Sequence, residues 1–158
     1  MENINPFFSQ PKQKAKEPLK PLKQIASTQT EPKKRKTRSD KCHDIKFPVR
    51  KEEKILLQMH CKQFSALYQP VKQTKFNTLL LRFALMHPDR VNWDFDYQDS
   101  KQYMHTKLLE SEYADIGGPF GLAIEKGFSE RKTVTCMVMS ALQFVDQGGS
   151  YGEIIKQL

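Results

Sequence analysis

The alternation of apolar and polar positions changes its period at residue 50. Residues 45–50, IKFPVR, place an apolar side chain at every second position, which predicts a short strand with one buried side. From Lys51 to Tyr68 the apolar residues recur with the helical period, and acidic residues stand in the first turn, where the helix dipole favours them. Pro70 ends this predicted helix.

A second helix is predicted from near Thr74, as its N-cap, to His87, just before Pro88. Its apolar residues lie almost all round the helix, which indicates burial on nearly every side. One strand and one other helix cannot cover such a surface, so we expect a second copy of the chain to pair its strand and intertwine its helices. The residues expected in this dimer core are Ile45, Phe47, Val49, Leu56, Leu80 and Phe83.

The order, the lengths and the amino-acid sequences of these elements resemble those of the ribbon–helix–helix family, the MetJ and Arc type of DNA-binding protein. The segment IKFPVRKEEKILL is similar to the family's strand-to-helix junction, and NTLLLRFAL is similar to its second helix. The resemblance covers residues 45–88. The turn YQPVKQT departs from the family pattern, because it carries a proline and lacks the glycine that the family often has there.

The resemblance implies that a two-stranded ribbon enters the major groove of DNA and that its outward residues read base edges. These residues are Lys46, Pro48 and Arg50. Lysine and arginine donate to O6 and N7 of guanine, whereas proline can only contact a thymine methyl group. The first residues of the second helix, Thr74 and Lys75, are expected on the phosphate backbone, because free N–H groups and the helix dipole attract an anion there.

Residues 89–158 leave two interpretations open. KQYMHTKLLESEY predicts a strand that enters a short helix, and GFSERKTVTCMVMSALQFV predicts a helix that begins at Ser129. Residues 101–147 would then repeat the first unit, as in tandem conjugation accessory proteins of the TraY type. Against this, DIGGPFG would break the first helix of the repeat. We therefore favour a small α-rich C-terminal domain, residues 89–158, that serves oligomerisation or protein contact.

Charge is distributed unevenly along the chain. Lys and Arg outnumber Asp and Glu by eleven to five in residues 1–44 and by eight to two in residues 45–88, whereas acids prevail by eleven to seven in residues 89–158. The overall net charge of +8 suggests a polyanionic partner. Residues 1–44 also hold five of the nine prolines, which predicts a disordered basic arm. Its candidate phosphate contacts are Lys33, Lys34, Arg35, Lys36 and Arg38.

Other chemistry finds little support in the sequence. His60 and Cys61 are neighbours on a predicted helix and diverge by about 100°, so they do not converge on one metal ion. No nucleophile, base and orienting group form a recognisable set. We therefore expect no enzyme activity, no metal and no cofactor. The sequence has no apolar run of membrane-span length and no signal-peptide core, and its three scattered cysteines suit a reducing cytoplasm.

These features predict a mostly helical protein with short β structure, an intertwined ribbon–helix–helix homodimer or tetramer that binds double-stranded DNA with sequence preference. We expect it in the cytoplasm, with the nucleoid or a plasmid and not with a membrane. The favoured role is an accessory protein of a plasmid or mobile element, in a relaxosome at an origin of transfer with a relaxase, or in partition with a partition ATPase. A transcriptional repressor is the alternative. A protein-interaction scaffold dimer without DNA function is the alternative of another class.

Overall fold

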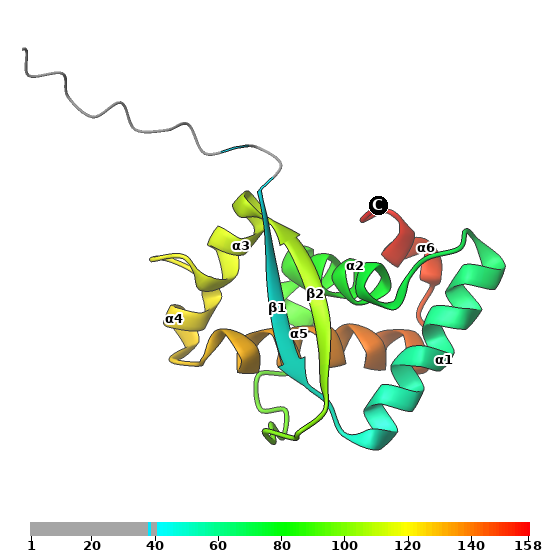
Figure 1. The fold of residues 1–158 in the computed structure, drawn as a ribbon, viewed down its shortest axis with the longest axis horizontal. Coiled ribbons are helices and arrows are strands. Elements are labelled where there is room, and N and C mark those ends of the chain that lie inside the picture. The colour runs from blue at the N-terminus through cyan, green and yellow to red at the C-terminus, as the bar shows by residue number, and fades with distance from the viewer. Residues whose placement is uncertain (1–37, 39–40) are drawn as a thin grey trace, which may run out of the picture. The chain divides into compact units, whose positions relative to one another are not determined.

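The computed structural model describes residue 38 and residues 41–158, which belong to one compact unit. This unit is mostly helical and contains a small two-stranded antiparallel sheet (Figure 1). In chain order, its elements are β1 (Cys42–Pro48), α1 (Lys51–Leu67), α2 (Gln73–Met86), the short 3-10 helix η1 (Pro88–Arg90), β2 (Tyr103–Leu109), α3 (Glu110–Gly117), α4 (Leu122–Lys126), α5 (Glu130–Asp146) and α6 (Tyr151–Ile155).

The strand partner of β1 is β2 of the same chain. The two strands run antiparallel, and Lys46 faces His105 at the middle of the ribbon. The expectation that the first strand lacks a neighbour in its own chain is therefore wrong. β2 lies within the segment KQYMHTKLLESEY, where a strand was predicted. One of its buried positions is polar: the hydroxyl group of Thr106 donates to the carbonyl oxygen of Ile45 at 3.3 Å.

The second half of the unit follows the element order of the first, with one short helix added. β1 leads into α1 and then α2, while β2 leads into α3, the short α4 and then α5. The strand-to-helix junctions also match: the backbone N–H of Arg50 donates to Glu53, and that of Leu109 donates to Glu112. In both junctions a glutamate three residues into the helix satisfies an otherwise free amide. The segment DIGGPFG, predicted to break the helix, begins inside α3 and ends it at Gly117, so α3 is correspondingly short.

One hydrophobic core joins the two halves. α2 packs against β2, α5 packs against β1, and the two helices pack against each other (Figure 1). The residues expected in a dimer core lie inside this core: Ile45, Phe47, Val49, Leu80 and Phe83 are buried, and Leu56 is half-buried against it. The predicted boundary at residue 88 therefore does not separate two folding units. The apolar surface of α2 is covered by β2 and α5, which is why no second copy is needed to bury it.

Aromatic contacts fasten the helices around this core. The ring of Phe83 in α2 stacks on Phe144 in α5, with centroids 5.0 Å apart. The short α6 is held against α1 by Tyr151, whose hydroxyl group lies 2.5 Å from Nδ1 of the buried His60. His60 also places Nε2 3.2 Å from a carboxylate oxygen of Asp146, so one side chain links α1 to the end of α5 and to α6.

Two buried threonines allow a matched test of how α2 holds β2. Thr78 donates to its own helix at Thr74 and accepts the backbone N–H of Lys107 at 2.9 Å, whereas Thr133 only donates to its own helix at Ser129. We expect Thr78→Val to lower the free energy of unfolding by about 1–3 kcal/mol more than Thr133→Val, because it leaves a strand amide without an acceptor. Urea denaturation followed by circular dichroism measures both, and equal losses would contradict the contact.

Candidate nucleic-acid interface

The outward face of the ribbon carries polar and basic side chains from both strands. The register places Lys46 opposite His105 and Asp44 opposite Lys107, so these four residues share one face. Residues opposite each other in an antiparallel pair point to the same side of the sheet. Asp44, Lys46 and Lys107 are exposed and His105 is partly exposed, whereas the alternate positions of both strands point into the core.

A histidine–carboxylate hydrogen bond crosses this face. Nδ1 of His105 lies 2.9 Å from Oδ1 of Asp44. Within the described part of the chain, the ammonium groups of Lys46 and Lys107 have no ion pair and remain turned to solvent. The ribbon therefore presents two uncommitted lysines on either side of a histidine–aspartate pair.

The three base-reading residues expected from the sequence meet different outcomes. Lys46 lies on the outward face of the ribbon, as predicted. Pro48 is buried, so the prediction that it points out toward a thymine methyl group is wrong. It lies at the end of the ribbon opposite Tyr103, beside the point where the backbone N–H of Val49 donates to Gln102 and joins the strand to the preceding loop.

Arg50 lies beyond the ribbon and not within it. It is the N-cap residue of α1, and its guanidinium Nη2 lies 2.5 Å from Oδ2 and 3.0 Å from the carbonyl oxygen of Asp96. Nε also lies 3.9 Å from Glu53. The prediction that Arg50 is an outward ribbon residue is therefore wrong, because β1 ends at Pro48. Arg50 lies beyond the strand and pairs with Asp96 in an acidic loop.

The N-terminus of α2 adjoins the ribbon through Lys107. A groove of about 330 Å³ lies there, lined by Cys42, Lys72, Thr74, Lys75, Thr78, Arg82, Lys107 and Leu109. The helix begins one residue before the predicted N-cap, so Lys72 is the N-cap and Thr74 lies in the first turn. The first intrahelical bond runs from the N–H of Phe76 to the carbonyl oxygen of Lys72, which leaves the preceding amides free for an anion.

The charges around this groove are mostly positive. Lys72, Thr74 and Lys75 are exposed, and none of them has an ion pair in the described residues. Arg82 is already committed, since its guanidinium Nε lies 2.6 Å from Oε1 of Glu112. Lys107 belongs to both the groove and the outward face of the ribbon, so the two form one continuous basic surface.

The N-terminus of α5 differs from that of α2. Ser129 caps it, as predicted, by accepting the N–H of Lys132. Glu130 follows and accepts the hydroxyl proton of Tyr113 at 2.7 Å, a bond that raises the pKa of the tyrosine. Arg131 lies over the ring of Tyr103, with 5.7 Å from its guanidinium carbon to the ring centroid. The first turn of α5 therefore carries an acid, Glu130, and an arginine that already contacts Tyr103, whereas the first turn of α2 carries lysines without an ion pair in the described residues.

The far end of the ribbon, next to α3, is neutralised by local pairing. Glu110 hydrogen-bonds His43 and lies 3.2 Å from Nζ of Lys41. The bond from His43 first, and then the lysine, holds the pKa of the Glu110 carboxyl below its usual value. His43 also stacks on Tyr113, with ring centroids 3.9 Å apart. Lys41 and His43 are therefore engaged by Glu110 at this end of the ribbon.

The candidate phosphate contacts of the arm mostly lie outside the described residues. This holds for Lys33, Lys34, Arg35 and Lys36. Arg38 is described and is exposed. Sequence reasoning overlooked His105, Lys107 and Lys72. The strand prediction for KQYMHTKLLESEY contained the signal for the first two, because alternation in that strand already puts His105 and Lys107 on one face.

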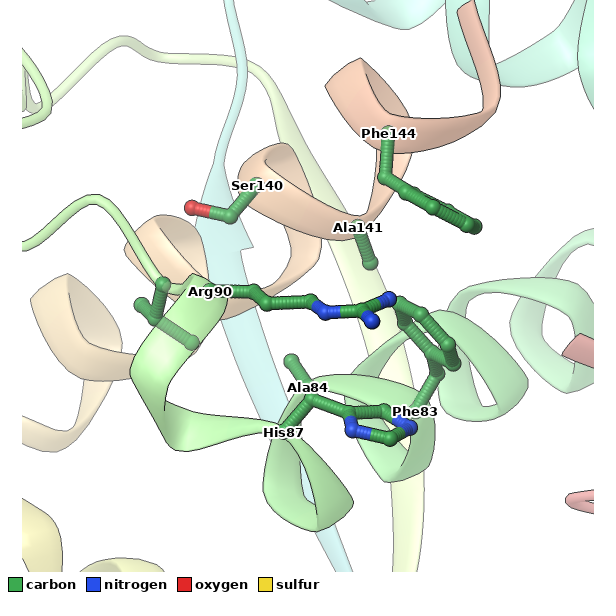
Figure 2. A pocket seen from close by; sticks show the side chains of 8 residues that line it. Phe83, Ala84, His87, Arg90, Ser140, Ala141 and Phe144 are labelled. Atoms are coloured by element: carbon green, nitrogen blue, oxygen red, sulfur yellow. The ribbon is translucent and has the colours of Figure 1, made fainter. Parts of the chain in front are cut away.

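One cavity in the described part of the chain is too small to hold a ligand larger than water. Figure 2 shows a cavity between the end of α2, η1 and α5 whose volume is about 10 Å³, the space of one water molecule. Arg90 crosses it and lies over the ring of Phe144. Among residues 38 and 41–158, no group of three His, Cys, Asp or Glu side chains could hold a metal ion. Burial raises the pKa of the Cys61 and Cys136 thiols, which disfavours thiolate chemistry.

No described helix is both long and apolar enough to cross a membrane. Comparison of the chain with protein-family models, with curated proteins and with solved structures finds no match to any of them.

Proposed function

We propose that this chain binds double-stranded DNA through the outward face of the β1–β2 ribbon and the N-terminus of α2. The observation that carries the proposal is the continuity of the basic surface: Lys107 belongs both to the ribbon and to the groove at the start of α2. A two-stranded ribbon has the width to enter the major groove of B-DNA. A helix N-terminus next to it would then meet the phosphate backbone.

Each part of the surface has a chemical role in this proposal. Lys46 and Lys107 donate to O6 and N7 of guanine from opposite strands of the ribbon. Thr74, Lys75 and the free amides of α2 bind a phosphate group, with Lys72 adding charge. The basic residues of the arm add salt-dependent affinity that does not distinguish sequences.

The proposal includes a ribbon–helix–helix arrangement built by one chain. Each half runs from a strand through a helix to a long last helix, with the short α4 added in the second half. The two strands pair, and each half places its long last helix against the strand of the other half. A homodimer is then not needed to complete the ribbon. Self-association, if it accompanies DNA binding, would join chains on neighbouring sites.

The two halves of the ribbon would read unlike half-sites. Lys46 of β1 faces His105 of β2, and the free lysines of α2 have no counterpart at α5, where Glu130 and Arg131 are engaged. A target for such a surface is asymmetric and gives the bound protein a direction on DNA. Direction matters at an origin of transfer, so an accessory role on a plasmid or mobile element, beside a relaxase or a partition ATPase, is the favoured biology, and repression is the alternative.

A protein-interaction scaffold is the second candidate, and a specific surface feature favours it. Phe120, in the turn between α3 and α4, is fully exposed, and Ile124 in α4 is 63 % exposed. Large apolar side chains so exposed are typical of contact surfaces. In this case the ribbon would be irrelevant, and loss of the ribbon lysines would leave partner binding unchanged.

The test is a selection experiment with the full-length chain. A pool of duplexes of about 30 base pairs with a randomised centre is bound at about 50 mM and 200 mM salt and then sequenced. We expect one asymmetric sequence to be enriched, and the affinity of the pool to fall steeply between the two salt concentrations. Salt-sensitive binding without any enriched sequence would contradict base reading, and no binding would contradict the proposal as a whole.

A further inference from the structure

The middle of the ribbon pairs a lysine with a histidine, and the histidine is held by a carboxylate. His105 lies opposite Lys46, its side chain is 40 % exposed, and Nδ1 is 2.9 Å from Oδ1 of Asp44. Building on the proposed DNA-binding function, we propose that His105 reads a base edge through Nε2 and that its base preference reverses when the imidazole gains a proton.

The argument begins with the hydrogen-bonding capacity of the pair. An ionised carboxylate can only accept hydrogen bonds, so Nδ1 of His105 carries the hydrogen that faces Asp44. In the neutral ring Nε2 is then an acceptor, and in the protonated ring it is a donor. Within the described residues Nε2 has no hydrogen-bond partner, because the side-chain contact of His105 is made by Nδ1.

The base edges in the major groove distinguish these two states. A neutral Nε2 can accept from the N4 amino group of cytosine or the N6 amino group of adenine. A protonated Nε2 donates instead. Guanine offers it two acceptors, O6 and N7, and no amino group on that edge, whereas adenine and thymine each offer one acceptor. One side chain therefore prefers an amino-bearing edge at higher pH and a guanine edge at lower pH, while Lys46 across the ribbon remains a donor throughout.

The charged groups that face His105 lie on the outward face of the ribbon. The carboxylate of Asp44 is 2.9 Å from Nδ1, Lys46 lies opposite His105 on β1, and Lys107 follows two residues along β2. Behind the ribbon α2 contributes the uncharged amide of Asn77, which donates to the carbonyl oxygen of His105 at 3.1 Å. No described charged side chain of α5 contacts His105. The charged groups near the ring are therefore one carboxylate and two ammonium groups, all on the surface that would contact DNA.

The test repeats the selection of the randomised duplex pool at about pH 6 and about pH 8 with the full-length chain. We expect one position of the enriched site to change from guanine at low pH to cytosine or adenine at high pH, with the relative affinity changing about fivefold or more. In His105→Lys, guanine is retained at both values. In His87→Gln, which alters a histidine at the C-terminal end of α2 whose ring is tilted against Phe83, the pH-dependent change persists.

The outcomes separate this inference from the function on which it rests. If the chain binds and enriches a sequence, but the preference is the same at both pH values, the role of His105 is overturned while DNA binding stands. The same conclusion follows if His105→Lys still changes its preference with pH. If no duplex is bound at either pH, the proposed function itself is overturned.

Discussion

Leu142→Ala is expected to lower the free energy of unfolding of the whole described unit by about 2–5 kcal/mol. Leu142 lies in α5 and is 0 % exposed, and α5 packs against both β1 and α2. Truncating the side chain removes buried apolar contacts and leaves a cavity that the surroundings fill only in part. Because the core is shared, the substitution should destabilise the first half of the chain as well as the second.

Two probes decide whether the unfolding is shared. Urea denaturation is followed by the fluorescence of Trp93, which is the single tryptophan, and by the helical signal in circular dichroism. We expect one transition, coincident by both probes, displaced to lower urea in the variant. Gln143→Ala changes the exposed neighbour on the same helix and should leave the midpoint nearly unchanged. If the variant unfolds in two separate transitions as urea is raised, the claim that the two halves share one core is contradicted.

The second large effect concerns DNA. Replacing Lys46 and Lys107 together by alanine is expected to weaken binding to the selected duplex about 100-fold or more, because each lysine contributes about 1–3 kcal/mol to base recognition. Both side chains are exposed, so stability should change little. Fluorescence anisotropy with a labelled duplex measures the affinity, and denaturation confirms that the variant is folded.

A control variant with the same change in charge separates the loss of base contacts from the loss of net charge. Lys62→Ala with Lys156→Ala removes the same charge from exposed positions in α1 and near the C-terminus. If DNA is held only by net charge, the two double variants weaken binding equally, and the ribbon assignment fails. Lys75→Ala offers a further contrast: a phosphate contact should weaken all sequences alike and lower the salt slope by about one.

The first strand and the long helices could be predicted from the sequence because their apolar residues are periodic. Ile45, Phe47 and Val49 alternate, and the helices α1 and α5 carry apolar stripes at the helical period. Strong periodicity of this kind reports burial directly. For the same reason the nearly all-round apolar character of α2 indicated burial on nearly every side. That burial is provided by β2 and α5 of the same chain, whereas the sequence led us to expect a second copy.

The interface was harder to predict because its decisive contacts are long-range or polar. The sequence predicted a strand in KQYMHTKLLESEY, but nothing in it indicated that this strand pairs with β1, where the hydroxyl group of Thr106 donates to Ile45. Arg50 is held by Asp96, 46 residues along the chain, and nothing in its local sequence indicates that pair. Pro48 alternates with core residues but lies at the end of the ribbon, where it is buried.

The most direct measurement of the central claim is the number of chains bound to one site. A duplex carrying a single selected sequence is held far above its dissociation constant and titrated with the chain, while anisotropy is followed to its break point. If one chain supplies both strands of the ribbon, the break falls at one chain per duplex. A break at two chains per duplex, with none at one, would mean that the reading surface is assembled from two copies and would contradict this account.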